Sequence, residues 1–258
     1  MAAFRPGWLA EMAVGRIAAR KTGCLCDGIR KSGIMSATGK FKAVFFDVDG
    51  TIFSSEGIIL DVYHDNFQKF QQETGKPERL PTLDEVMAQI GKPVRTIFDN
   101  LVPELSFEEK ERLSNAILAD LVSRIENGKG DYYPGITDAV KALHEAGLMI
   151  FAASNGRKPY VDAILKACGI YDFFTEVPVL DYKSIHTKEE LVAHTLQKHG
   201  LMPQECALLG DRESDRQAAL QNSVAYIACA YGHGDAEEHR DAIQIIQKPE
   251  EMLFLIKD

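Results

Sequence analysis

The sequence predicts an α/β protein built on a parallel β-sheet that is flanked by helices. The first observation is the fully apolar run Ala43–Phe46, because strands buried on both faces of a parallel sheet are continuously apolar. The second is that similar runs recur at 148–153, 206–209 and 224–228. The third is that segments with helical spacing separate these runs, and such alternation indicates parallel strands joined by helical crossovers.

The segments between the apolar runs repeat apolar residues at helical spacing. Ile136, Val140 and Leu143 share one face, which predicts a helix that ends near Gly147. Phe174–Leu180 is a weaker strand candidate, because a proline interrupts the run and cannot donate to a sheet. The predicted helices of this half lie at 136–143, 160–168, 191–196 and 214–222.

Residues 58–128 lack the strand pattern and predict a helical domain inserted after the first strand. Ile59, Tyr63 and Phe67 follow helical spacing, and Ser106-Phe107-Glu108-Glu109 has the form of a capping box that opens a long helix. We therefore expect a core domain of residues 41–57 and 129–258, and an all-helical cap of residues 58–128.

Composition limits the class of protein. The net charge of −9 argues against a general nucleic-acid binder, and no apolar run approaches the ~20 residues of a membrane helix. The five cysteines are an odd number, which argues against a disulfide framework, and Cys24 and Cys26 lack the second pair of a zinc site. Reduced thiols fit a cytoplasmic protein, and we expect a monomer or a small homo-oligomer.

The first 40 residues differ from the rest in charge. Residues 1–40 contain seven Lys or Arg and two Asp or Glu, whereas the remainder contains 22 and 36. A basic, acid-poor start is compatible with an organellar targeting segment. An upstream extension, or a misplaced start before Met35, explains it equally well, so we treat 1–40 as a basic N-terminal extension.

Candidate functional side chains stand directly after the apolar runs. Asp47 and Asp49 follow the first run, Ser154 the second and Asp211 the third. Open α/β sheets bind ligands at the carboxyl ends of their strands, so these groups are expected to converge. Two such close carboxylates resist joint ionisation unless a cation compensates them. Mg²⁺ takes oxygen ligands and joins carboxylates to substrate phosphate.

A lysine at a helix start adds a candidate phosphate ligand. Thr187-Lys188-Glu189-Glu190 has the form of a capping box, which places Lys188 in the first helical turn. Helix starts favour anions through their free N–H groups and their dipole. Lys183 is the competing candidate for this role.

Together these residues resemble the haloacid dehalogenase-like hydrolase superfamily, in particular its phosphoglycolate phosphatase and β-phosphoglucomutase branch. The resemblance covers residues 41–258 and implies a Rossmann-like sheet with a small helical cap. It departs from the family pattern at Ile52–Ser55, where an acidic residue is common, and Lys188 lacks the usual Lys-Pro context. The four motifs match Asp47-Val48-Asp49-Gly50-Thr51, Ser154, Lys188, and Gly210-Asp211 with Asp215.

The resemblance implies an aspartyl-phosphate route. Asp47 is expected to attack phosphorus, and Asp49 to protonate the leaving oxygen and then activate water. The expected cofactor is Mg²⁺, held by the carboxylate of Asp47, the backbone carbonyl of Asp49, and Asp211.

The remaining motif residues are expected to hold the phosphoryl group. Ser154 and Asn155 would bind the substrate, and Lys188 would balance its charge. Asp215 would orient Lys188 or a metal-bound water, although an acid is also simply favoured at a helix start.

The expected function is a Mg²⁺-dependent phosphatase for a small phosphorylated metabolite, such as a phosphoglycolate-like compound or a sugar phosphate. Haloacid dehalogenases usually lack the second aspartate, so Asp49 favours phosphoryl transfer. The alternatives are a β-phosphoglucomutase-type mutase, a catalytically silent regulatory module, and phosphonate cleavage through a cap lysine. Lys92 and Arg95 are ambiguous candidates for substrate contact in the cap, and His233 is equally ambiguous in its loop.

Overall fold

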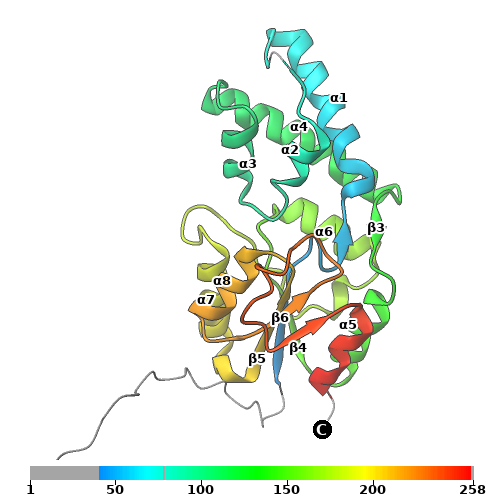
Figure 1. Ribbon diagram of the computed structural model, residues 1–258, viewed down its shortest axis with the longest axis vertical. Coiled ribbons are helices and arrows are strands. Elements are labelled where there is room, and N and C mark those ends of the chain that lie inside the picture. Colours follow the sequence, from blue (N-terminus) through cyan, green and yellow to red (C-terminus); the bar gives the residue numbers. More distant parts are fainter. Residues whose placement is uncertain (1–40, 78, 257–258) are drawn as a thin grey trace, which may run out of the picture. The chain divides into compact units, whose positions relative to one another are not determined.

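The computed structural model describes residues 41–77 and 79–256. The basic extension, Cys24 and Cys26 therefore lie outside the described residues. Figure 1 shows a β-sheet flanked by helices, as the sequence predicts. Its five strands have the order β4-β1-β5-β6-β7, and every neighbouring pair is parallel. The strands are β1 (Ala43–Phe46), β4 (Met149–Ala152), β5 (Cys206–Gly210), β6 (Ala225–Cys229) and β7 (Gln244–Ile246).

The central strand β1 explains the apolar run that opens the sequence pattern. All four of its side chains are inaccessible to solvent, because β4 and β5 flank it and helices cover both faces. Val44 and Phe46 pack in one apolar cluster, and Ala43 and Phe45 pack in the other. This is the alternation that a strand requires, with neighbouring residues on opposite faces.

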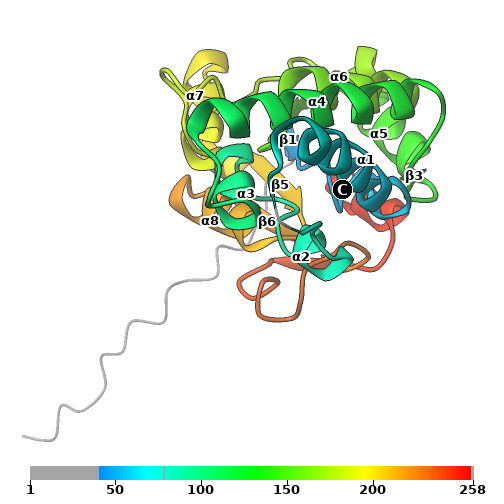
Figure 2. The ribbon, with the colours of Figure 1, turned by 90° about the horizontal axis from the view of Figure 1, so that it is seen from above.

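The two clusters assign the helices to faces. Helices α5 (Ile136–Glu145) and α6 (Lys158–Ala167) contribute to the cluster of Val44, and α7 (Lys188–His199) and α8 (Glu213–Gln221) contribute to that of Ala43. Figure 2 shows the sheet between these helices from above. The short helices of the core are 3₁₀ turns at Tyr171–Phe173, Pro203–Glu205 and Pro249–Ile256.

Among the described residues, four helices follow one another along the chain between β2 (Phe53–Ser54) and β3 (Asp131–Tyr132), and these two strands pair antiparallel. Helix α1 packs against α4, and α4 also packs against α6 of the core. The predicted capping box is present, since the Ser106 hydroxyl accepts from Glu109 N–H and the Glu109 carboxylate accepts from Ser106 N–H. The boundaries 58–128 for the cap stay a prediction. The helices are α1 (Glu56–Thr74), α2 (Leu83–Met87), α3 (Val94–Leu101) and α4 (Phe107–Glu126).

Two details of the five-stranded sheet differ from the prediction. Phe174–Leu180 forms no strand, only isolated bridges at Glu176 and Val179, because the intervening proline has no N–H to continue the ladder. Strand β7 was not predicted, since it has three residues, two of them exposed at the sheet edge. Within the described residues, no helix combines the length and apolar character needed to cross a membrane.

Candidate active site

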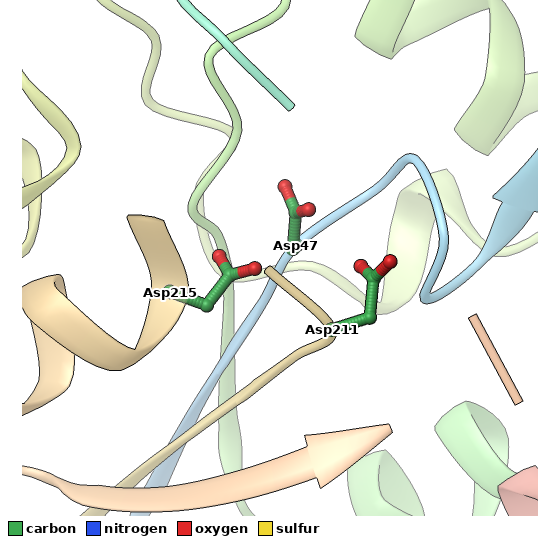
Figure 3. Close-up of side chains that lie close together, drawn as sticks. All are labelled: Asp47, Asp211 and Asp215. Carbon is green, nitrogen blue, oxygen red and sulfur yellow. The ribbon is translucent and has the colours of Figure 1, made fainter. Parts of the chain in front are cut away.

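The strand register brings the residues that follow β1, β4 and β5 to one edge of the sheet. Phe46 of β1 is paired with Ala152 of β4 and with Leu209 of β5, so the residues that follow emerge side by side. Asp47 continues the ladder by donating its N–H to Leu209 O at 2.9 Å. Figure 3 shows Asp47 and Asp211 at these strand ends with Asp215 on the adjacent helix α8. One carboxylate oxygen from each lies within 4.8 Å of the others.

Lys188 is the cation at the centre of this group. It opens α7 and is 2% exposed, and its Nζ lies 2.9 Å from Asp47 Oδ1 and 2.6 Å from Asp215 Oδ1. Thr187 caps the helix, but the expected capping box is incomplete, because the Glu190 carboxylate accepts from His186 N–H instead. Lys183, the competing candidate, is exposed, and its backbone N–H donates to Asp181 Oδ1 at 2.8 Å.

The carboxylate oxygens of the site have separate partners. Asp215 Oδ2 accepts from Arg212 N–H at 3.0 Å, so both oxygens of Asp215 are taken. Asp211 Oδ2 accepts from His233 N–H at 2.8 Å. Asp47 Oδ2 and Asp211 Oδ1 are buried without any hydrogen-bond partner among the described residues. Two unpartnered carboxylate oxygens of this kind fit a hard divalent cation, whereas Asp215 is better suited to holding Lys188.

Burial and crowding of charge perturb these groups. Burial raises the pKa of Asp47 to about 6, although Lys188 opposes the shift. Burial and the charge of Asp215 raise the pKa of Asp211 to about 7, and the pKa of Asp215 is raised to about 7 by burial and the charge of Asp47. Burial alone would lower the pKa of Lys188, but Asp215 and Asp47 outweigh it and raise that pKa. The excess of carboxylates over cations favours a bound divalent metal.

Asp49 has a hydrogen-bond partner outside this cluster, a tyrosine. The hydroxyl of Tyr160 on α6 donates to Asp49 Oδ1 at 2.6 Å. Burial raises the pKa of Asp49 to about 6, and the bond from Tyr160 opposes that rise. In the sequence, Tyr160 is only the first residue of the helix predicted at 160–168. The available signal was that a buried tyrosine usually needs a hydrogen-bond partner for its hydroxyl.

Ser154 and Asn155 form the turn after β4. Ser154 is buried, and its Oγ accepts from Gly156 N–H at 3.0 Å. Asn155 donates from Nδ2 to Gly91 O of the cap at 2.7 Å, and its buried Oδ1 has no partner in the described structure. Both residues line the same cavity as Asp47 and Asp49.

Gly50 is required by the close approach of the first and fourth motifs. Its φ is +81°, in the left-handed region that favours glycine. A Cβ atom there would lie 2.2 Å from Asp211 Oδ2. The glycine therefore lets the loop after β1 pass directly beside a candidate metal ligand.

A cavity of about 90 Å³ extends from Asp47 and Asp49 to the cap helices. Arg157, which no sequence motif indicates, lines this cavity and donates to Asn115 Oδ1 and Ser114 O of α4, both at 2.6 Å. These contacts of Arg157 depend on how the cap packs against the core, so no local pattern in the sequence predicts them. Of the three ambiguous candidates, Lys92 lines this cavity. Arg95 lines a neighbouring cavity, and its guanidinium stacks over the ring of Phe107. His233 Nδ1 lies 3.1 Å from Glu56 Oε1.

Known proteins resemble this chain in sequence and in fold. A phosphoglycolate phosphatase of Thiobacillus denitrificans is 24% identical over 74% of this chain and 84% of its own length. Pyrophosphatase PpaX of Listeria monocytogenes is 24% identical over 86% of this chain and 99% of its own. The crystal structure of a predicted phosphoglycolate phosphatase from Haemophilus somnus superposes with a TM-score of 0.74, at 21% identity, over 85% of this chain and 100% of that one. Residues 41–222 match the family model of haloacid dehalogenase-like hydrolases, and the chain therefore belongs to this family.

Proposed function

We propose that this hydrolase is a Mg²⁺-dependent phosphatase acting on a small phosphorylated metabolite through a phosphorylated Asp47. The observation that carries the proposal is a cluster around Asp47. Asp47 and Ser154 line one cavity, Lys188 Nζ lies 2.9 Å from Asp47 Oδ1, and Asp47 Oδ2 and Asp211 Oδ1 have no hydrogen-bond partner among the described residues. The names of the relatives, phosphoglycolate phosphatase and pyrophosphatase, also support hydrolysis at phosphorus.

Asp47 is the proposed nucleophile. Lys188 holds one of its oxygens at 2.9 Å and leaves the other free, which orients the carboxylate. Asp47 and Asp211, with the backbone carbonyl of Asp49, would hold Mg²⁺. When bound, the ion would offset the repulsion between an anionic nucleophile and an anionic phosphate. Formation of the acyl phosphate on Asp47 divides one difficult displacement into two easier ones.

Asp49 is the proposed acid and base. Because its pKa is raised to about 6, both protonation states are accessible near neutral pH. In the first step the protonated carboxyl gives its proton to the leaving oxygen. In the second the carboxylate takes a proton from the water that attacks the phosphorylated Asp47. Ser154 and Asn155 would donate hydrogen bonds to the phosphoryl oxygens, and Asp215 would keep Lys188 in place.

The test combines substitution, chelation and product analysis. Asp47→Asn is expected to abolish phosphate release from an aryl phosphate, whereas Asp172→Asn at an exposed core position should keep it. Excess chelator should silence the wild type, and added Mg²⁺ should restore it. Substantial turnover by Asp47→Asn, or full activity in chelator, contradicts the proposal. Isomerised sugar phosphate without free phosphate would identify a mutase instead.

A further inference from the structure

The turn after β4 is fastened to the cap at two places. Asn155 Nδ2 donates at 2.7 Å to Gly91 O, in the loop between α2 and α3. Arg157, the residue before α6, donates through its two terminal nitrogens to Ser114 O and Asn115 Oδ1 of α4, both at 2.6 Å. All three bonds cross from the core side of the cavity to its cap side. The turn that carries the proposed phosphoryl ligands therefore also holds the opposite wall.

The guanidinium of Arg157 is a charged group that relies on the cap for its acceptors. It is half-buried, and burial lowers the pKa of the guanidinium. Glu111 of α4 opposes that shift by its charge and not through a hydrogen bond. A cation that loses solvent needs acceptors, and hydrogen bonds from a charged donor are about twice as strong as neutral ones. The bonds of Arg157 therefore hold the cap more strongly than the neutral bond from Asn155 does.

The contact of Arg157 with α4 lies between two cavities. A cavity of about 470 Å³ adjoins the reaction cavity of about 90 Å³. Phe107 and Tyr182 line the larger cavity and are 53% and 39% exposed, so solvent reaches it. The residues that line both cavities are Val94, Phe98, Ser114 and Arg157. Arg157 comes from the core, whereas the other three belong to α3 and α4.

We propose that Arg157 is a positioning residue that holds α4 against the core and so closes the reaction cavity toward the larger, solvent-filled one. This role rests on the proposed phosphatase function. With the wall in place, bulk water is kept from the space above Asp47, and charge interactions there stay strong. Loss of the bonds lowers the fraction of molecules with a closed cavity, which raises the apparent KM in proportion.

The kinetic test compares two arginines. Arg157→Met removes the donors and keeps most of the side-chain length. It should lower kcat/KM for acetyl phosphate and for phosphoglycolate by the same factor, roughly 10- to 150-fold, mainly through KM. Arg124→Met is the matched control, because Arg124 pairs with Asp65 and Asp120 inside the cap, and it should keep the wild-type values. A loss confined to phosphoglycolate would assign the guanidinium to the substrate carboxylate and overturn the positioning role, as would an equal loss in both variants.

A second substitution tests the same contact from the cap. Asn115→Ala removes one acceptor of Arg157, and Asn115 is not among the residues that line either cavity. It should lower kcat/KM by about tenfold, and it should add little to Arg157→Met, because the bond is already absent there. Additive losses from the two substitutions would contradict a shared contact.

Hydrogen–deuterium exchange measures the contact without catalysis. The backbone amides of residues 154–157 and of the cap loop 90–92 should exchange about tenfold faster in Arg157→Met than in the wild type, and Arg124→Met should leave them unchanged. Unchanged exchange in Arg157→Met overturns the positioning role. If the wild type hydrolyses neither phosphate, the phosphatase proposal fails, and the exchange rates alone decide whether Arg157 holds the cap.

Discussion

The hydrogen bond from Tyr160 to Asp49 makes a defined prediction about pH dependence. Tyr160 is buried on α6, and its hydroxyl donates to Asp49 Oδ1 at 2.6 Å. Tyr160→Phe removes this donor and keeps the ring that packs between core and cap. Since the donor stabilises the ionised carboxylate, its loss should raise the pKa of Asp49 above its value of about 6.

The magnitude follows from the chemistry of the bond. A hydrogen bond to a charged group contributes about 1.5–3 kcal/mol, and a free-energy change of 1.36 kcal/mol corresponds to one pKa unit. The pKa of Asp49 should therefore rise by about 1–2 units. Because protonated Asp49 serves the first step, the alkaline limb of kcat/KM should move to higher pH. Because ionised Asp49 serves the second, the acid limb of kcat should move the same way.

The assay is steady-state phosphate release from an alkyl phosphate between about pH 5 and pH 9, where the ordinary and shifted pKa values both fall. Tyr132→Phe is the matched control, since its hydroxyl donates at 3.1 Å to Ile164 O and not to the site. The control should keep the wild-type pH profile. A uniform drop in activity of Tyr160→Phe, with both limbs in place, would refute the assignment of Asp49 as the acid and base.

Three further predictions concern stability and the metal site. Gly50→Ala and Gly147→Ala both place alanine at positive φ, +81° and +85°. Gly147→Ala should lose about 1–2 kcal/mol of unfolding free energy in urea, and Gly50→Ala should lose more, because its Cβ also overlaps the Asp211 carboxylate. Only Gly50→Ala should also lose phosphate release, because its Cβ would meet the Asp211 carboxylate, whereas a Cβ at Gly147 would meet nothing within 4 Å. An equal loss of activity in both variants would contradict the role given to Gly50. Lys188→Met should lose about 3–5 kcal/mol of unfolding free energy, because two buried carboxylates lose their cation. The control Lys69→Met, at an exposed position, should change that free energy by less than about 0.5 kcal/mol. Similar small losses in both variants would refute a structural role for Lys188. In chelator, stability should fall as pH rises from about 4 to 7, since folded Asp211 has a pKa of about 7 and keeps a proton that the unfolded chain has released. The slope is at most about 1.4 kcal/mol per pH unit for that proton, and a slope that Asp211→Asn leaves unchanged contradicts this origin.

The sheet was predictable where burial acts on both faces of a strand. The runs at β1, β5 and β6 are apolar without interruption because each strand lies between two neighbours and under helices. Strand β4 ends the sheet on one side, but Ile150, Phe151 and Ala152 are buried there too. The same argument fails for β7, whose two exposed residues at the sheet edge need not be apolar. It also overrates Phe174–Leu180, where composition suggests a strand but the backbone lacks the donors for a continuous ladder.

The location of the core-side groups could also be predicted, because parallel strands fix which residues emerge together. Asp47, Ser154 and Asp211 follow their strands by one or two positions, and the register carries them to one edge. Tyr160 and Arg157 could not be found in this way. Tyr160 meets a partner 111 residues away, and Arg157 meets acceptors on a cap helix. Their contacts depend on how the cap packs, and no local spacing reports that.

The partners of individual carboxylate oxygens support a division of roles that the sequence alone leaves open. Asp215 lies as close to the cluster as a metal ligand would, yet both of its oxygens accept hydrogen bonds, one of them from Lys188. Asp47 shares Lys188 but keeps one oxygen free, as does Asp211. A cation that needs unpartnered oxygens would therefore bind between Asp47 and Asp211. Lys188 would remain with Asp215, and the second aspartate of the first motif would stay with Tyr160 for proton transfer.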